Sequence, residues 1–441
     1  MPDFARSEDA AVQRQIDRLM ALGPGTDVLG LERITQLLQR IGDPHRRLPP
    51  VLHVAGTNGK GSTCAYLRAA TEAAGMRAHV YSSPHLVRFN ERIRIAGRLI
   101  DDHRLASLLA GVLDAGGDIG ASFFEVTTAA AFLAFAETPA DVCIIEVGLG
   151  GRLDATNVLA DPAATAIAQL GIDHQAFLGD TIAAIAFEKA GIAKSGRPLV
   201  MLDAPAEAVA VIDAHAHQVG APVYRAGVDW HFRAEGSQLI YHDRHGDLST
   251  PLPALAGVHQ HANLALALAT LRHQDRIDVP VEALRSAASG ARWPARMQRL
   301  SAGPLTDRLA PGTPVWLDGG HNANAAEALA AAIRAAANGQ PIAIVIGMLA
   351  NKDAETMMAR LAPLADQLIA VPIEGHAAHA PEVLARLARV QGIPAIGTAE
   401  DVAAALDHIG ARRGTRTAPV LICGSLYLAG RVLAANNELP E

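Results

Sequence analysis

A glycine-rich loop between a predicted strand and a predicted helix carries the clearest chemical signal in this sequence. Residues 51–63 read VLHVAGTNGKGST, so an apolar strand runs into three glycines, a lysine and a serine. Glycines let backbone N–H groups point at phosphate oxygens, and the N-terminus of the following helix attracts negative charge. Lys60 can reach the β- and γ-phosphates of a nucleotide. The predicted nucleotide-binding residues are Gly56, Thr57, Asn58, Gly59, Lys60, Gly61 and Ser62.

The loop departs from the strict GxxxxGK[ST] pattern of nucleotide-binding loops. Val54 stands where the first glycine of that pattern would be, and Gly61 separates Lys60 from Ser62. The alternative is a tight strand-to-helix turn that binds nothing. That alternative does not explain why the glycines, the lysine and the serine hydroxyl stand at the positions that phosphate binding needs. We therefore expect this loop to bind phosphate.

An acidic residue ends another predicted strand. Glu146 is the last residue of the apolar run VCIIE, and ligands of open α/β sheets bind beyond the carboxyl ends of the strands. A carboxylate that faces a phosphate loop is an expected Mg²⁺ ligand, because hard cations take oxygen ligands. The alternative is an acid exposed to solvent. The polar loop that follows contains Arg152, Asp154, Thr156 and Asn157, which could bind substrate or order the site.

Lysine is rare in this sequence. Four of the 38 basic residues are lysines, namely Lys60, Lys189, Lys194 and Lys352. A chain that uses arginine for ordinary positive charge keeps lysine where a compact amine that can lose its proton is needed. Lys189 lies among apolar residues in the helical pattern AFEKAGI, and its alternatives are a surface position or a pair with Glu188. Lys194 suits the end of that helix, where it complements the helix dipole.

Short apolar runs alternate with helical patterns from about Val51 onwards. Helices are expected over 62–74, 103–113, 126–137 and 180–193, the second capped by Asp101 or Asp102 and the last by Asp180. Strands that alternate with helices predict βαβ units and a parallel sheet.

The stretch ARWPARMQRLSAGP, residues 291–304, interrupts this alternation and predicts a boundary that gives domains 1–297 and 298–441. Beyond it the alternation restarts in a second α/β domain of ordinary size. Its strands are expected at 314–320, 342–349, 367–373, 394–397 and 419–425, with helices after Asn324, Ala354, Pro381, Glu400 and Leu426.

The composition excludes several classes of protein. With 50% hydrophobic and 19% charged residues, the chain is globular rather than disordered or fibrous. It has no uninterrupted run of about 18 apolar residues, and residues 1–20 lack the apolar core of a signal peptide. We therefore expect a soluble, cytoplasmic protein without a membrane partner. The net charge of −7 disfavours nucleic acid as a partner, and three cysteines without CxxC spacing predict reduced, buried thiols.

The loop GTNGKGS resembles the nucleotide loop of the Mur ligase superfamily, and its Gly-Ser ending is similar to that of the folate branch. That branch comprises dihydrofolate synthase and folylpolyglutamate synthase. Further blocks resemble those of the family in the same order, at residues 82–95, 123–132, 145–157, 171–181, 188–194, 257–263, 293–296, 318–325 and 347–353. The resemblance implies a Mur-ligase-like P-loop ATPase domain followed by a smaller, Rossmann-like α/β C-terminal domain.

The resemblance also implies two Mg²⁺ sites. Ser83 would bind the first ion together with Glu146, and His174 would bind the second. A buried ammonium beside a metal would be costly and would repel it, whereas a deprotonated Lys189 can react with CO₂ to give a carbamate with anionic oxygens. Related ligases carry a carbamylated lysine at this position, and we expect one at Lys189. A lone histidine is more often structural than a ligand, and that alternative stays open for His174.

Two further residues are similar to nucleotide contacts of the family. Asn263 would read the adenine edge, and Arg296 would reach the phosphates with two parallel hydrogen bonds. His259 and Gln260, just before Asn263, could equally cap the helix that follows.

The turn DGGHN of the second domain resembles the place where the family brings ATP and the amino acid together. Asp318 and His321 would take that role, and a purely structural Asx-turn is the alternative. This sequence departs nearby from the family pattern, with Ala323 in place of a usual proline and Asn351 in place of a common acid. The stretch 376–381 also lacks an expected arginine. Glutamate recognition is therefore the least defined part of the interpretation.

The implied reaction is an ATP-dependent amide ligation. The carboxylate of a pteroate or folate attacks the γ-phosphorus of ATP, and the amine of L-glutamate then displaces phosphate from the acyl phosphate. Acyl phosphates hydrolyse, so closure of the two domains before the reaction is expected. The expected catalytic residues are Lys60, Lys189, His174, Asp318 and His321, and the expected substrate-binding residues are Phe124, Glu125, Arg152 and Asp154. The Phe124 ring could stack on a flat heterocycle.

Three alternatives remain open. The chain could carry only one of the two synthase activities, although we favour a bifunctional monomer. It could be another Mur-type ligase acting on a cell-wall precursor, but only residues 1–50 precede the loop, too few for a UDP-binding domain. It could also be a P-loop ATPase that has lost the ligase role, which the complete set of metal and lysine positions disfavours. ATP hydrolysis without an amino acid would indicate the last alternative.

Overall fold

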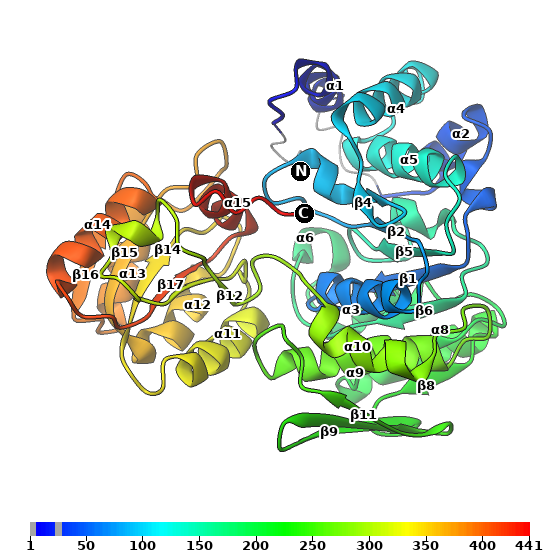
Figure 1. Ribbon diagram of the computed structural model, residues 1–441. Helices are drawn as coiled ribbons and strands as arrows, with labels where there is room; N and C mark the ends of the chain where they lie inside the picture. The colour runs from blue at the N-terminus through cyan, green and yellow to red at the C-terminus, as the bar shows by residue number, and fades with distance from the viewer. Residues whose placement is uncertain (1–5, 23–28) are drawn as a thin grey trace. The chain divides into compact units, whose positions relative to one another are not determined.

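The computed structural model describes residues 6–22 and 29–441, which form two compact units (Figure 1). The first unit comprises residues up to Ala254, Gln260–Arg292 and Glu441, and the second comprises Leu255–His259 and Trp293–Pro440. The predicted domain limits differ from these units at residues 255–259, at residues 293–297 and at Glu441. Residues 1–5 and 23–28 lie outside the described part. The first five residues of the segment 1–20, which is predicted not to be a signal peptide, are therefore not described.

The first unit is built on an eight-stranded, mostly parallel sheet with the order β4-β3-β2-β5-β1-β6-β7-β8. Strands β3 and β4 pair antiparallel at one edge, and the other pairs are parallel except β2 with β3. Its strands are β1 (Val51–Ala55), β2 (Ala78–Tyr81), β3 (Ile93–Ile95), β4 (Arg98–Leu99), β5 (Val142–Glu146), β6 (Ala164–Ile167), β7 (Leu199–Met201) and β8 (Val223–Arg225). A separate antiparallel sheet contains β9 (Trp230–Glu235), β10 (Gln238–Asp243) and β11 (Gly246–Pro251), and the sequence-based expectations do not include it.

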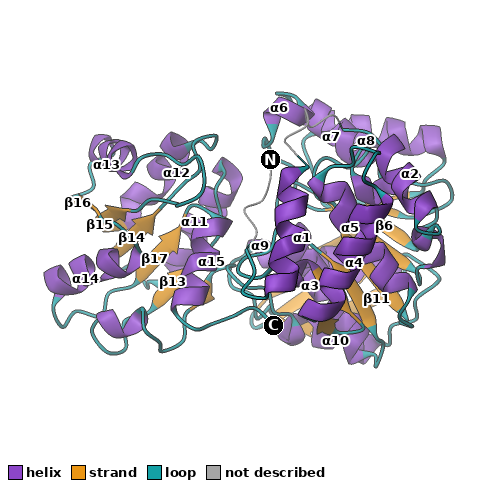
Figure 2. Ribbon diagram, turned by 90° about the horizontal axis from the view of Figure 1, so that it is seen from above, coloured by secondary structure: helices purple, strands orange, loops and turns teal. Residues whose placement is uncertain are grey.

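Helices surround the strands of this unit (Figure 2). They are α1 (Ala10–Ala21), α2 (Glu32–Arg40), α3 (Lys60–Ala73), α4 (Asp102–Ala115), α5 (Phe123–Ala136), α6 (Gln175–Leu178), α7 (Ile182–Ala190), α8 (Ala206–Val219), α9 (His259–Arg272) and α10 (Val281–Gly290). Short 3₁₀ segments cover Pro44–Arg47, Phe89–Arg92 and Ala155–Val158.

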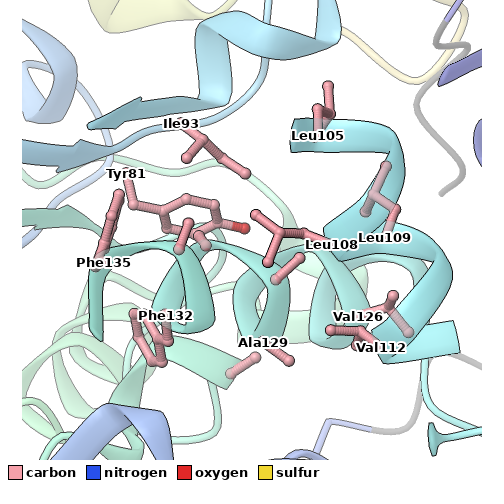
Figure 3. Close-up of a cluster of buried hydrophobic side chains, with 14 of the residues drawn as sticks. Tyr81, Ile93, Leu105, Leu108, Leu109, Val112, Val126, Ala129, Phe132 and Phe135 are labelled. Carbon is pink, nitrogen blue, oxygen red and sulfur yellow. The ribbon is translucent and has the colours of Figure 1, made fainter. Parts of the chain in front are cut away.

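A hydrophobic cluster of this unit lies between helices α4 and α5 and one face of the sheet (Figure 3). Side chains of both helices meet Tyr81 of β2 and Ile93 of β3 there, and Cys143 and Ile145 of β5 belong to the same cluster. Successive strand residues point to opposite faces. Helix α3 contacts β1, β2 and β5 without belonging to that cluster, so it covers the other face. All five residues of β1 are buried, as expected for a central parallel strand.

The second unit is a six-stranded sheet with the order β12-β13-β17-β14-β15-β16, parallel apart from the β12–β13 pair. Helices α11, α12 and α13 contribute to the hydrophobic cluster on one face, and α14 and α15 contact β14, β15 and β17. The strands are β12 (Gln298–Arg299), β13 (Val315–Leu317), β14 (Ile342–Ile346), β15 (Ala365–Ala370), β16 (Ala395–Thr398) and β17 (Val420–Cys423). The helices are α11 (Ala323–Ala336), α12 (Ala354–Leu361), α13 (Pro381–Val390), α14 (Val402–Arg413) and α15 (Leu426–Ala435), with 3₁₀ segments at Thr306–Arg308 and Ala362–Leu364.

Local capping confirms one predicted helix start and corrects another. Asp101 caps α4 by accepting from the N–H of Arg104. The predicted cap Asp180 is wrong, because α7 starts one residue later and the hydroxyl of Thr181 accepts from the N–H of Ala184.

None of the helices in residues 6–22 and 29–441 is both long and apolar enough to cross a membrane.

Candidate active site

Four neighbouring strands of the first sheet end at one edge, and a predicted site residue lies at or beyond each end. The strands β2, β5, β1 and β6 are consecutive in the sheet and parallel. Glu146 is the last residue of β5 and pairs in register with Val54 of β1. Ser83 follows β2, the nucleotide loop follows β1, and His174 follows β6. Because carboxyl ends of parallel strands meet at the same edge, the fold brings these residues to one end of the sheet.

The nucleotide loop makes a tight turn at Gly59, the last residue before helix α3, where only glycine fits. Gly59 has φ of +85°, and a Cβ atom there would lie 2.3 Å from Oδ1 of Asn263. The N–H of Thr57 donates to the carbonyl of Gln169, which holds the loop against the end of β6. Helix α3 then begins at Lys60, and its first N–H groups have no intrahelical acceptor. The positive end of the helix dipole therefore faces this loop, as an anion site needs.

Two lysines converge on the first residue of the loop. Nζ of Lys60 donates to the Gly56 carbonyl at 3.1 Å, and Nζ of Lys189, in the last turn of α7, donates to the same oxygen at 2.9 Å. Lys189 is 3% exposed. Burial lowers the pKa of its amine to about 7, and the charge of Lys60 acts in the same direction. The surface alternative for Lys189 is therefore wrong, and Glu188 pairs with Arg152 at 2.8 Å instead.

A pocket at this edge contains three of the predicted catalytic residues, Lys60, His174 and Lys189. His174 has a left-handed backbone with φ of +54°, and its N–H donates to the carboxylate of Asp173 at 2.8 Å. Such a conformation is uncommon for residues other than glycine and is found preferentially at functional sites. The pocket is lined by Gly56, Thr57, Lys60, Val147, Gly148, Leu149, Gly150, Asp173, His174, Leu178 and Lys189.

The donor groups at the strand ends fit a cation that is held partly by substrate. Within residues 6–22 and 29–441, no three His, Cys, Asp or Glu side chains gather as a metal site. Mg²⁺ is commonly bound by one or two protein oxygens together with phosphates and waters. The buried carboxylate of Glu146 and the hydroxyl of Ser83 suit such an ion. His174 and the unmodified Lys189 offer nitrogen atoms, so a hard cation there needs added oxygen ligands.

The loop after Glu146 is braced from within by Asp154. Its carboxylate accepts from the N–H of Leu149 at 2.8 Å and from the N–H of Thr156 at 3.0 Å. The Thr156 hydroxyl also donates to Asp154 and lies 2.8 Å from Nε2 of His53 on β1. Burial raises the pKa of Asp154, and these hydrogen bonds oppose that effect. Asp154 thus orders the loop, and its predicted contact with substrate stays a prediction.

The two other predicted substrate residues lie at the start of α5. The ring of Phe124 packs on Gly148 of the pocket wall, where a Cβ atom would lie 2.4 Å from it. Glu125 forms a capping box with Ser122 and an ion pair with Arg33 at 3.0 Å. Phe124 is therefore beside the pocket, whereas the known contacts of Glu125 are structural.

A buried glutamine that the sequence interpretation leaves without a site role contacts the nucleotide loop. Gln260 donates to the hydroxyl of Ser62 and accepts from the side chain of Asn263. Asn263 itself lies against Gly59. The sequence signal that could have indicated Gln260 is its spacing from Asn263, because residues three apart lie on the same face of a helix. The structure thus places Asn263 and Gln260 beside the loop, and the adenine contact of Asn263 stays a prediction.

The predicted residues of the second unit are held together by their own turn. Asp318 accepts from the N–H of Met297 at 2.8 Å and from that of Gly320 at 2.7 Å, so the Asx-turn alternative is observed. Nδ1 of His321 lies 3.0 Å from the carbonyl oxygen of Gly319, whose N–H donates to the carbonyl of Ala295 beside Arg296. The turn and the segment containing Arg296 are therefore adjacent, and their contact with ATP stays a prediction.

Comparison with known proteins decides the family. Residues 54–271 match the family model of the Mur ligase middle domain, and residues 304–435 match the C-terminal domain of dihydrofolate synthetase. The dihydrofolate synthase/folylpolyglutamate synthase of Escherichia coli strain K12 is 35% identical over 407 residues, which cover 92% of this chain and 90% of that protein. The chain belongs to the dihydrofolate synthase/folylpolyglutamate synthase family. The predicted membership in the folate branch of the Mur ligases is confirmed.

Solved structures of the family have the same fold. Escherichia coli FolC in complex with DHPP and ADP has a TM-score of 0.85 and 34% identity, with 96% of this chain and 97% of that chain covered. A bifunctional folylpolyglutamate synthase/dihydrofolate synthase with Mn, AMPPNP and L-glutamate bound has a TM-score of 0.82 and 33% identity, with the same coverage. The predicted fold class, a P-loop ATPase domain followed by a smaller Rossmann-like domain, is confirmed.

Proposed function

We propose that the chain is an ATP-dependent ligase that joins L-glutamate to dihydropteroate and also extends folates with glutamate. The observation that carries the proposal is the convergence of Lys60, His174 and Lys189 on one pocket beside Gly56, in a chain of this family. ATP and a divalent metal ion are its cofactors, and its substrates are small molecules.

The chemical step follows from the positions of the loop and the two lysines. A carboxylate oxygen of dihydropteroate or folate attacks the γ-phosphorus of ATP, the bond to the β-phosphate oxygen breaks, and ADP leaves. The loop N–H groups and Lys60 hold the phosphates in line with the acceptor. The amine of L-glutamate then attacks the acyl phosphate carbon, loses a proton and displaces inorganic phosphate.

The metal ligands are proposed in two groups. Ser83 and Glu146 would hold one Mg²⁺, and His174 with carbamylated Lys189 would hold a second. Bound Mg²⁺ would neutralise charge on the transferring phosphoryl group. A pKa near 7 supports the carbamate at Lys189, because a neutral amine is the species that reacts with CO₂. The buried carboxylate of Glu146 at the strand end supports the first site.

The second unit is proposed to supply the remaining contacts. Arg296, Asp318 and His321 would meet ATP and the amino acid, and Asn263 of the first unit would contact the adenine. The adjacency of Arg296 to the turn that begins with Asp318 supports a joint role. A monomeric state, a cytoplasmic location and the lack of a nucleic-acid partner stay predictions.

Phosphate release from Mg·ATP tests the proposal, with L-glutamate and either dihydropteroate or tetrahydrofolate as acceptor. Release with both acceptors, dependent on glutamate, is the expected result. Release with one acceptor alone would indicate a member with a single synthase activity. Release without glutamate would indicate a simple ATPase, and no release with either acceptor would contradict the folate substrates and favour another acceptor acid.

A further inference from the structure

Gln260, in the first turn of α9, is joined to the nucleotide loop through buried hydrogen bonds. Its side chain is fully buried. Nε2 donates to Oγ of Ser62 at 3.2 Å, and Oε1 accepts from Nδ2 of Asn263 at 3.0 Å and from the hydroxyl of Tyr66 at 3.5 Å. One side chain therefore contacts both a loop hydroxyl and a second predicted nucleotide ligand.

These bonds make Oγ of Ser62 a hydrogen-bond acceptor from Gln260. Because Oε1 of Gln260 faces Asn263 and Tyr66, its Nε2 faces Ser62, and Oγ of Ser62 is the acceptor. A serine that accepts from Gln260 keeps its own hydrogen for another acceptor. A phosphate oxygen is the acceptor for which the glycine-rich loop is suited. Asn263 is fixed on its other side, where Oδ1 lies against Gly59.

The residues directly before Gln260 belong to the other unit. Leu255–His259 cluster with the second unit, where Ala256 packs against the hydrophobic core and Gly257 approaches Ala332 of α11. A single peptide bond thus separates the second unit from the residue whose side chain holds the nucleotide loop.

We propose that Gln260 is a positioning residue that sets the Ser62 hydroxyl and the Asn263 amide for the nucleotide, and that it couples nucleotide binding to the backbone of residues 255–259. Gln260 acts through these two residues and takes no part in the chemistry. The proposal rests on the proposed nucleotide site, and its test needs neither folate nor glutamate.

Calorimetric titration of the full-length protein with Mg·ADP tests the positioning role. Gln260→Met and Ser62→Ala should each weaken ADP binding about tenfold, because each removes the same buried hydrogen bond. The double variant should be no weaker than the weaker single variant, as expected for coupled residues. Gln274→Met is the matched control with unchanged affinity, since Gln274 lies just beyond the same helix and donates to Leu271 and Ile277.

Gln260→Glu is the second variant, because it keeps the shape and the acceptor oxygen and loses the N–H donor. Gln260→Glu takes the place of Gln260→Met in the titration if thermal unfolding shows that methionine disrupts the core. The affinity of Gln260→Glu for ADP should fall by at least the tenfold expected for Gln260→Met, since the added negative charge also faces the phosphates.

Hydrogen–deuterium exchange separates the coupling from the nucleotide site itself. In the wild type, saturating Mg·ADP should slow exchange in both 56–62 and 255–259. In Gln260→Met, protection of 56–62 should persist and that of 255–259 should be lost. The proposal would be overturned if Gln260→Met bound ADP as tightly as the wild type, or if the fold losses in affinity of the two single variants multiplied in the double variant. It would also be overturned if ADP protected residues 255–259 from exchange in Gln260→Met as it does in the wild type. No ADP binding by the wild type would instead overturn the proposed nucleotide site.

Discussion

Nζ of Lys189 and the carbonyl oxygen of Gly56 are joined by a hydrogen bond of 2.9 Å, although 133 residues separate them in the chain. The bond connects the last turn of α7 to the first residue of the nucleotide loop. A carbamate keeps one N–H on Nζ, so this contact can survive the modification while two new oxygens enter the pocket. The proposed carbamate at Lys189 would therefore lie beside Gly56 of the nucleotide loop.

The carbamate at Lys189 should depend on pH in a defined direction. Burial lowers the amine pKa to about 7, so the neutral and reactive form increases as the pH rises through 7. A lysine with an ordinary pKa near 10.4 would remain almost fully protonated. With ¹³C-labelled bicarbonate, the carbamate signal in NMR spectra should grow between pH 6 and 8 and be missing in Lys189→Ala. A protein without this signal at pH 8 would contradict the proposal.

Replacing Asp154 should mainly loosen the loop after β5. Asp154→Ala removes the acceptor for one buried and one partly buried N–H group and for a hydroxyl, so we expect the free energy of unfolding to fall by about 1–3 kcal/mol. Thermal unfolding of the ligand-free protein measures this effect. Asp161→Ala, which breaks only exposed ion pairs with arginines, is the control and should cost under about 1 kcal/mol. Full stability of Asp154→Ala with lost activity would point to direct substrate contact instead.

The folding stability of the protein should fall when Asp318 is replaced by asparagine, which has nearly the same shape and differs in hydrogen-bonding capacity. Asp318→Asn replaces one acceptor oxygen by a donor, so a buried N–H of Met297 or Gly320 loses its partner. We expect a loss of about 1–3 kcal/mol in urea unfolding. Asp401→Asn is the matched control, because Asp401 caps α14 and asparagine caps equally well. Equal stability of both variants would rule out the bracing role of Asp318.

The buried side chain of His273 should make the folded protein less stable in mild acid than at neutral pH. Both ring nitrogens lack a hydrogen-bond partner among the described residues, and burial lowers the pKa to about 4 against the opposing pull of Asp243, while Arg244 and His245 lower it further. In the unfolded chain this histidine has a pKa near 6.5 and is protonated below that pH, whereas in the folded protein it stays neutral until the pH approaches 4. Stability should therefore fall as the pH drops from about 6.5 to 4. His273→Phe should flatten this fall in urea unfolding, and the exposed control His242→Phe should not.

The predicted part of the site came from patterns that are local in sequence. The alternation of strands and helices predicted that Ser83, Glu146 and His174 follow strand ends, whereas the metal roles of Ser83 and His174 came from the resemblance to the family. The scarcity of lysine singles out Lys189 as a candidate, and its side chain is buried in the structure. The helix cap at Thr181 was missed because Asp180 and Thr181 are both good caps and tertiary packing chooses between them.

Other features depend on contacts that sequence spacing does not encode. The sheet of β9, β10 and β11 is an exception, because Trp230–Glu235 alternates apolar and polar residues and so carries a strand signal that the predictions did not use. The segment 255–259 leaves the first unit for only a few residues, and no composition change marks it. The role of Gln260 depends on its contact with Ser62, which is 198 residues away.

The most direct test of the account is glutamate-dependent ligation by Lys189→Ala, measured as phosphate release from Mg·ATP with dihydropteroate as acceptor. We expect a loss on the order of 100-fold or more, comparable to removal of one electrostatic group from an active site, with partial recovery in formate or acetate. Lys194→Ala, which loses only a hydrogen bond to the Asn157 carbonyl, should stay close to wild type. Near-normal activity of Lys189→Ala would contradict the central role assigned to this lysine.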